Sequence, residues 1–101
     1  MNTLFTITES YLKYCETQKR LDKKTLKAYR TDLDQFISFF NNTYINTISI
    51  PDIEKYIGYL HQNFKPKTAK RKLASIKSFY HFLEYKDFIE QNPFNKIKIK
   101  F

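Results

Sequence analysis

Cations and small hydroxyl residues repeat at helical spacing between residues 65 and 83. This segment holds six basic residues, and no Asp or Glu occurs between Lys55 and Leu83. On a helix, the cations and the apolar residues fall on opposite stripes. A helix buried on its apolar side would present a cationic ridge that fits a groove lined with phosphates. The cationic stripe is Lys67, Lys70, Arg71, Ala74, Lys77 and Ser78, and the apolar stripe is Ala69, Leu73, Ile76, Tyr80 and Leu83.

A second cationic cluster runs from Lys19 to Arg30, and the two clusters hold twelve of the eighteen Lys and Arg residues. Each lies at or near the N-terminal half of a predicted helix, where every cation opposes the helix dipole by about a few tenths of a kcal/mol. Cations at these positions bring no benefit to a helix face that contacts only solvent, whereas they would help a helix face that binds phosphates. Thr25, Thr68 and Ser75 are interleaved with the cations and can donate to phosphate oxygens or contact base edges.

Patterns typical of catalysis or metal binding do not occur in this sequence. His61 and His81 are twenty residues apart without Cys or acidic neighbours at metal spacing, so we expect both at the surface. The single glycine, Gly58, cannot build a glycine-rich phosphate loop. We therefore predict no catalytic residue, no metal site, no cofactor and no small-molecule substrate, and the chain alone should not be an enzyme.

Length and composition predict one helical domain. One hundred and one residues suffice for a single core, and one Gly and three Pro leave few helix breakers. The net charge of +8 indicates a polyanionic partner, either nucleic acid or an anionic membrane surface. The aromatic residues lie on the apolar stripes, which favours core packing over base stacking and double-stranded over single-stranded DNA.

Apolar periodicity predicts four helices, over residues 7–19, 23–41, 51–64 and 67–85. Thr6 and Glu9 have the spacing of a capping box, and Asp22 can cap the second helix. Residues 41–49 are rich in Asn and Thr and predict a loop, with a short extended piece over 44–48 as an alternative. Asn92 and Pro93 predict a final turn or short helix.

The sequence contains no apolar run long enough to cross a membrane and no signal-peptide pattern. Cys15 is the single cysteine, so we interpret it as a core residue in a reducing compartment. These features predict a cytoplasmic protein without a membrane partner.

The chain resembles the N-terminal core-binding domain of tyrosine recombinases, the phage-integrase and Xer-like enzymes. The resemblance rests on residues 24–33 (KTLKAYRTDL) followed by Phe36, on residues 67–80 (KTAKRKLASIKSFY), and on Asn92-Pro93. It implies an all-α four-helix bundle of the SAM-like, integrase N-terminal type, in which the second and fourth helices face the DNA major groove. Carried over by position, and in agreement with the charge pattern, the predicted DNA contacts are Thr25, Lys27, Arg30, Lys67, Thr68, Lys70, Arg71, Ser75 and Lys77. The cationic cluster at the start of the second helix adds Lys23 and Lys24 to this set.

The resemblance also implies a role in DNA integration or recombination, with the catalytic groups in a C-terminal domain beyond this chain. We accordingly expect residues 1–97 to form the DNA-binding domain and residues 98–101 to begin a linker. It further implies that the full-length protein assembles as a tetramer on DNA, whereas the isolated domain is expected to be a monomer.

Three alternatives stay open on the sequence. A helix-turn-helix regulator would also be basic and helical, but its two reading helices need a short turn between them, and here a whole helix intervenes. A helical protein-interaction module would make the basic ridge irrelevant to DNA. Membrane-surface binding is disfavoured because the basic helices bury their apolar faces.

Overall fold

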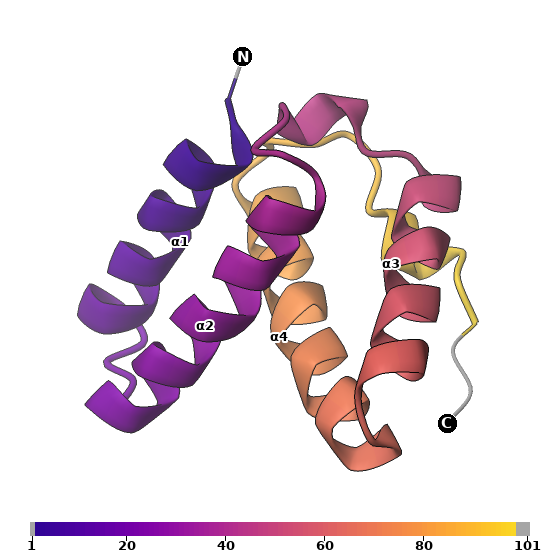
Figure 1. The fold of residues 1–101 in the computed structure, drawn as a ribbon. Helices are drawn as coiled ribbons and strands as arrows, with labels where there is room; N and C mark the ends of the chain where they lie inside the picture. The colour runs from indigo at the N-terminus through magenta and orange to yellow at the C-terminus, as the bar shows by residue number, and fades with distance from the viewer. Residues whose placement is uncertain (1, 99–101) are drawn as a thin grey trace.

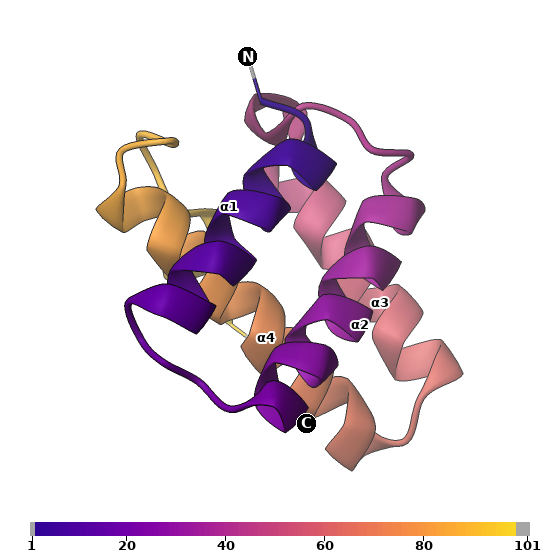
Figure 2. The same cartoon turned by 90° about the vertical axis from the view of Figure 1, so that its left-hand side faces the viewer.

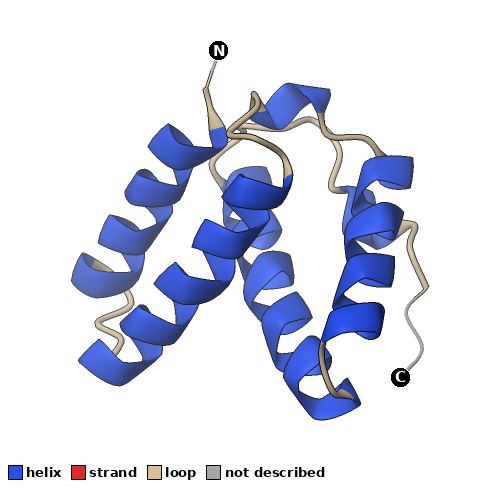
Figure 3. Ribbon diagram, in the orientation of Figure 1, coloured by secondary structure: helices blue, strands red, loops and turns tan. Residues whose placement is uncertain are grey.

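Four α-helices and two short 3₁₀ helices make up the computed structural model, which describes residues 2–98 (Figures 1 and 3). Within these residues no strand forms, apart from one isolated bridge between Thr3 and Tyr44. The predicted all-α fold is confirmed. The elements are α1 (Leu4–Thr17), α2 (Lys23–Phe39), η1 (Ile45–Thr47), α3 (Ile50–Asn63), α4 (Pro66–Tyr85) and η2 (Pro93–Asn95).

The start of α1 differs from the prediction. The helix begins at Leu4, because the Thr3 side chain accepts a hydrogen bond from the Thr6 backbone N–H and so caps the helix three residues earlier. The predicted capping box of Thr6 and Glu9 is therefore wrong, since both residues lie inside the helix. The earlier start also buries Leu4 completely.

The other helix starts follow local capping chemistry. Asp22 caps α2, as predicted, by accepting the Thr25 N–H at 2.7 Å. Ser49 caps α3 in a capping box with Asp52, and the helix begins at Ile50, one residue before the expected start. Pro66 opens α4, one residue before the predicted start at residue 67.

The chain folds as two antiparallel helix pairs, α1 with α2 and α3 with α4, that pack across one another (Figures 1 and 2). The connection between the pairs contains Asn41 and Asn42, which adopt the left-handed conformation that Asn tolerates. The Asn42 side chain accepts the Phe5 backbone N–H at 2.8 Å and ties this connection to α1. Residues 45–47 form η1 rather than an extended piece.

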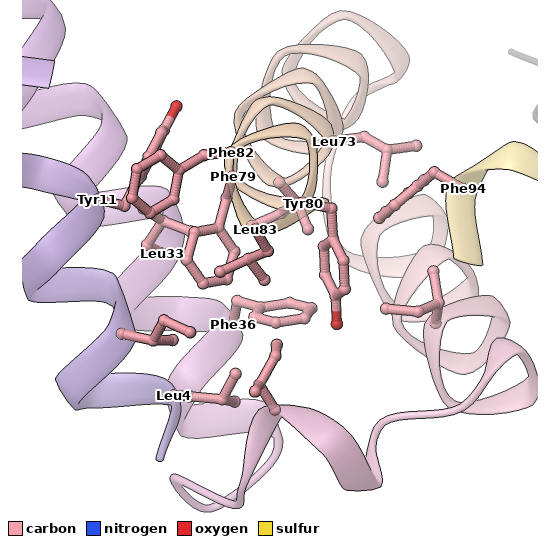
Figure 4. Packing of buried hydrophobic residues seen from close by; sticks show 14 of the residues in the cluster. Leu4, Tyr11, Leu33, Phe36, Leu73, Phe79, Tyr80, Phe82, Leu83 and Phe94 are labelled. Carbon is pink, nitrogen blue, oxygen red and sulfur yellow. The ribbon is translucent and has the colours of Figure 1, made fainter. Parts of the chain in front are cut away.

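Aromatic rings from all four helices belong to the core, and Figure 4 shows several of them at its centre. Phe36 of α2 makes edge contacts with Tyr56 of α3 and Tyr80 of α4, with centroids 5.0 and 6.2 Å apart. The whole predicted apolar stripe of α4 is buried. Cys15 is buried as well, and burial raises the pKa of its thiol, which supports its interpretation as a core residue.

The segment after α4 folds back onto the bundle and contains the predicted short helix as η2. Phe94 of η2 packs against the ring of Tyr80 at 5.3 Å, and Asn92 caps η2 by accepting the Phe94 N–H. The predicted linker falls on residues 98–101, of which residues 99–101 lie outside the described part of the chain.

We expect Phe36→Ala to remove about 3–5 kcal/mol of unfolding free energy, because it leaves a cavity where three helices meet. Phe39→Ala is the matched control on the same helix, since that ring is 37% exposed and should cost no more than about 2 kcal/mol. Urea unfolding followed by circular dichroism measures both values. Equal losses would contradict the assignment of Phe36 to the core centre.

Candidate nucleic-acid interface

A groove between α2 and α4 brings residues of the two predicted cationic clusters together. The two helices pack directly on each other, although α3 separates them in sequence. Small side chains form much of the groove surface, so another molecule can approach the helix backbones closely. The groove is lined by Lys24, Thr25, Ala28 and Tyr29 from α2, and by Arg71, Ala74, Ser75 and Ser78 from α4.

Six predicted contacts are exposed lysines of these two helices. Among residues 2–98, none of the six forms an ion pair. Their ammonium groups are therefore available to an external anion. They are Lys23, Lys24 and Lys27 on α2, and Lys67, Lys70 and Lys77 on α4.

The N-terminal turns of α2 and α4 differ in their electrostatics. In α2, hydrogen bonds from the backbone and side chain of Thr25 lower the pKa of the Asp22 carboxyl, with a smaller contribution from Lys24. This anionic cap offsets part of the repulsion between the helix dipole and the nearby lysines. In α4, the N-cap residue Lys65 makes no side-chain capping bond, and the first turn contains no acid. Half-buried Thr68 lies in the same turn.

Arg30, a predicted contact, is paired within the protein. Its guanidinium donates to Glu9 of α1 at 2.5 Å and lies 4.0 Å from Asp34. All three side chains are 41–54% exposed. Arg30 therefore brings less net positive charge to the surface than the six lysines, because two exposed acids surround it.

Arg71 and Ser75 converge on Asp32 of α2, which is fully buried. The carboxylate Oδ2 of Asp32 accepts from Arg71 Nη1 and from the Ser75 hydroxyl, each at 2.7 Å. Ser75 is only 4% exposed, so in this structure it holds Asp32 and does not face solvent. The Arg71 side chain is 50% exposed and reaches both Asp32 and the surface.

Lys72 completes this network, although it is not among the contacts predicted from the sequence. Its side chain is 5% exposed, and its ammonium donates to Asp32 Oδ1 at 3.2 Å and to Gln35 Oε1 at 2.6 Å. It also lies over the ring of Phe64, 4.9 Å from the centroid. The burial of Asp32 and Lys72 could have been predicted from their spacing. Asp32 stands four residues before Phe36 and Lys72 four residues before Ile76, so each shares a helix face with an apolar residue. The network is Asp32, Gln35, Arg71, Lys72 and Ser75.

The remaining candidate catalytic and metal-binding residues lie apart from one another. His61 and His81 are exposed on different helices, as predicted. No group of His, Cys, Asp or Glu side chains within residues 2–98 is arranged to hold a metal ion. None of the helices in this part of the chain is long and apolar enough to cross a lipid bilayer.

Comparison with known families agrees with this geometry. The profile of the phage integrase N-terminal SAM-like domain matches residues 8–87, which include all four helices except the first turn of α1. The chain therefore belongs to this family, and the resemblance noted in the sequence is confirmed. No solved structure matches the chain.

Relatives of the chain are tyrosine recombinases. One from Agathobacter rectalis is 55% identical over all of this chain and 33% of its own length. The tyrosine recombinase XerC of Oceanobacillus iheyensis is 28% identical over 98% of this chain and 34% of its own length. XerC of Staphylococcus haemolyticus is 34% identical over 84% of this chain and 30% of its own length. The chain thus spans about a third of the length of these curated relatives.

We expect Asp32→Ala to cost about 3–5 kcal/mol of unfolding free energy, because it leaves the buried ammonium of Lys72 without a counter-charge. Asp34→Ala should change stability by less than about 0.5 kcal/mol, because its pair with Arg30 is exposed. Urea unfolding again provides the measurement.

Adding Lys72→Met to Asp32→Ala should restore part of the loss, since the uncompensated charge is then gone. A single Asp32→Ala variant as stable as Asp34→Ala would show that the network contributes little to the fold.

Proposed function

We propose that this chain is the double-stranded DNA-binding domain of a site-specific tyrosine recombinase. The observation that carries the proposal is the set of exposed, unpaired lysines on α2 and α4, the two helices that form the groove. Membership of the integrase family supports a role in DNA integration or recombination. The duplex would lie across α2 and α4, with its phosphates against the lysines.

The proposed phosphate contacts are lysines, because a flexible, exposed ammonium adapts to the backbone of any sequence. Thr68 adds a hydroxyl in the first turn of α4. Arg30 contributes only if it exchanges Glu9 for a phosphate. Ser75 acts indirectly by holding Asp32. The phosphate contacts are Lys23, Lys24, Lys27, Lys67, Lys70 and Lys77.

A duplex fits this surface better than a single strand does. Among residues 2–98, Tyr29 is the one aromatic residue that lines the groove, and it is half-buried and stacked on Tyr11 with centroids 6.2 Å apart. Platforms for single-stranded DNA need exposed aromatic faces between the cations. The exposed aromatic residues of the described chain are Phe5, Phe39, Tyr44, Tyr59 and Tyr85, and none of them lines the groove.

The recombination chemistry would reside outside these 101 residues, because the matching family profile is that of an N-terminal domain and the relatives are about three times as long. In this proposal residues 1–97 form the domain that binds one face of the duplex, and residues 98–101 begin the connection to a catalytic domain. The full-length protein would assemble as a tetramer on DNA, while the isolated chain would stay monomeric and bind with modest affinity.

Fluorescence anisotropy with a mixed-sequence duplex tests DNA binding. Contacts with four to six phosphates predict a slope of log K against log salt of about −4 to −5. Lys70→Glu/Lys77→Glu should weaken binding and make the slope shallower by about 2, because two phosphate contacts are lost.

Lys13→Glu/Lys55→Glu is the matched control. It changes the net charge equally, but on α1 and α3, at exposed positions that do not line the groove. Equal effects of the two double variants, or no binding at low salt, would contradict the proposed interface. The second outcome would favour a protein-interaction module.

A further inference from the structure

Arg71 differs from every lysine at the groove, because its guanidinium is held by a buried group. Asp32 is fully buried and accepts three hydrogen bonds, from Arg71, Lys72 and Ser75. Two of these donors, Lys72 and Ser75, are themselves buried, so the carboxylate cannot rotate freely. The Arg71 guanidinium is therefore held through Nη1 by a rigid carboxylate, while the side chain as a whole is half-exposed.

One edge of the Arg71 guanidinium remains available for a ligand. The side chain makes a single hydrogen bond within residues 2–98, through Nη1, whereas the guanidinium carries five N–H donors. Nε and Nη2 lie side by side on the planar group and are not used by Asp32. Two parallel donors of this kind match the O6 and N7 acceptors that guanine presents in the major groove.

The groove surroundings allow a base edge to reach this arginine. Ala28 of α2 and Ala74 of α4 line the groove beside Arg71, and neither side chain extends past its Cβ. The exposed lysines of α2 and α4 stand on the same two helices and would bind the flanking phosphates. In the proposed complex, Arg71 would therefore lie where the protein meets the bases.

We propose that Arg71 reads a guanine in the major groove and that Asp32 is the residue that positions it. This inference rests on the proposed DNA-binding function and adds base specificity to it. An arginine held in place loses less side-chain entropy on binding, and its planar fork fits only one base. The lysines supply affinity for any sequence, and Arg71 supplies the preference for one base pair.

Selection of duplexes from a random library by this chain, followed by sequencing, tests the proposal. The wild-type chain should enrich guanine at one position by about 5- to 150-fold over other bases, the range expected for a bidentate arginine–guanine contact. Arg71→Ala should lose that preference at that position alone. Lys70→Ala, the neighbouring control, should weaken binding to all duplexes and keep the guanine preference.

Replacing the selected guanine with 7-deazaguanine removes the N7 acceptor and leaves base pairing intact. The wild-type chain should bind this duplex several-fold more weakly, whereas Arg71→Ala should bind both duplexes equally. Arg71→Ala leaves Asp32 paired with Lys72 and Ser75, so the variant should fold, and its circular dichroism spectrum checks this.

Asp32→Asn/Lys72→Met tests the positioning role, because the amide keeps the side-chain shape but loses the charge, and the methionine removes the ammonium that would otherwise be buried without a counter-charge. Lys72→Met alone, which keeps Asp32 paired with Arg71 and Ser75, is the control. The double variant should reduce the guanine preference relative to that control, and circular dichroism with urea unfolding checks that both variants fold. Combining the double variant with Arg71→Ala should cause no further loss of preference.

Two outcomes would contradict these proposals. If the wild type and Arg71→Ala both bind DNA in a salt-dependent way and select the same sequence, the inference is overturned and the proposed function still stands. Absence of binding to any duplex would overturn both.

Discussion

The buried carboxylate of Asp32 is the interaction on which the arrangement of α2 and α4 depends. A charged group without solvent is tolerated only where donors surround it, and here Arg71, Lys72 and Ser75 of α4 all donate to it. An apolar contact would permit small shifts between crossing helices. Three hydrogen bonds to one carboxylate define a single relative position of the two helices, and with it the spacing between their lysines.

This network also separates the cations of α4 by environment. Lys70, Arg71 and Lys72 are consecutive, yet they are exposed, half-exposed and buried in turn, because successive residues on a helix point about 100° apart. One short basic run thereby provides an exposed cation that we propose as a phosphate contact, a link between surface and core, and a structural ion pair. Gln35 and Phe64 satisfy the rest of the Lys72 ammonium, which makes burial of this lysine acceptable.

Much of the fold could be predicted from the chain because it depends on local patterns. The apolar stripe of α4, the Asp22 cap and the Pro66 start all follow from periodicity and side-chain chemistry within one helix. The errors arose where a nearby alternative competed. Thr3 and Thr6 are both possible caps, and the choice of Thr3 comes with the burial of Leu4 against the rest of the bundle.

The sequence by itself determined which helices form, which faces are apolar and where positive charge gathers, since these properties arise from residues within a few positions of one another. Only the tertiary structure decided how each cation is used. Asp32 and its partners on α4 are 39 to 43 residues apart, and nothing local indicates that they meet. The crossing of α2 and α4 brings Arg71, Lys72 and Ser75 to Asp32 and leaves Lys67, Lys70 and Lys77 facing solvent, because one side of α4 must pack on α2 while the other cannot reach it.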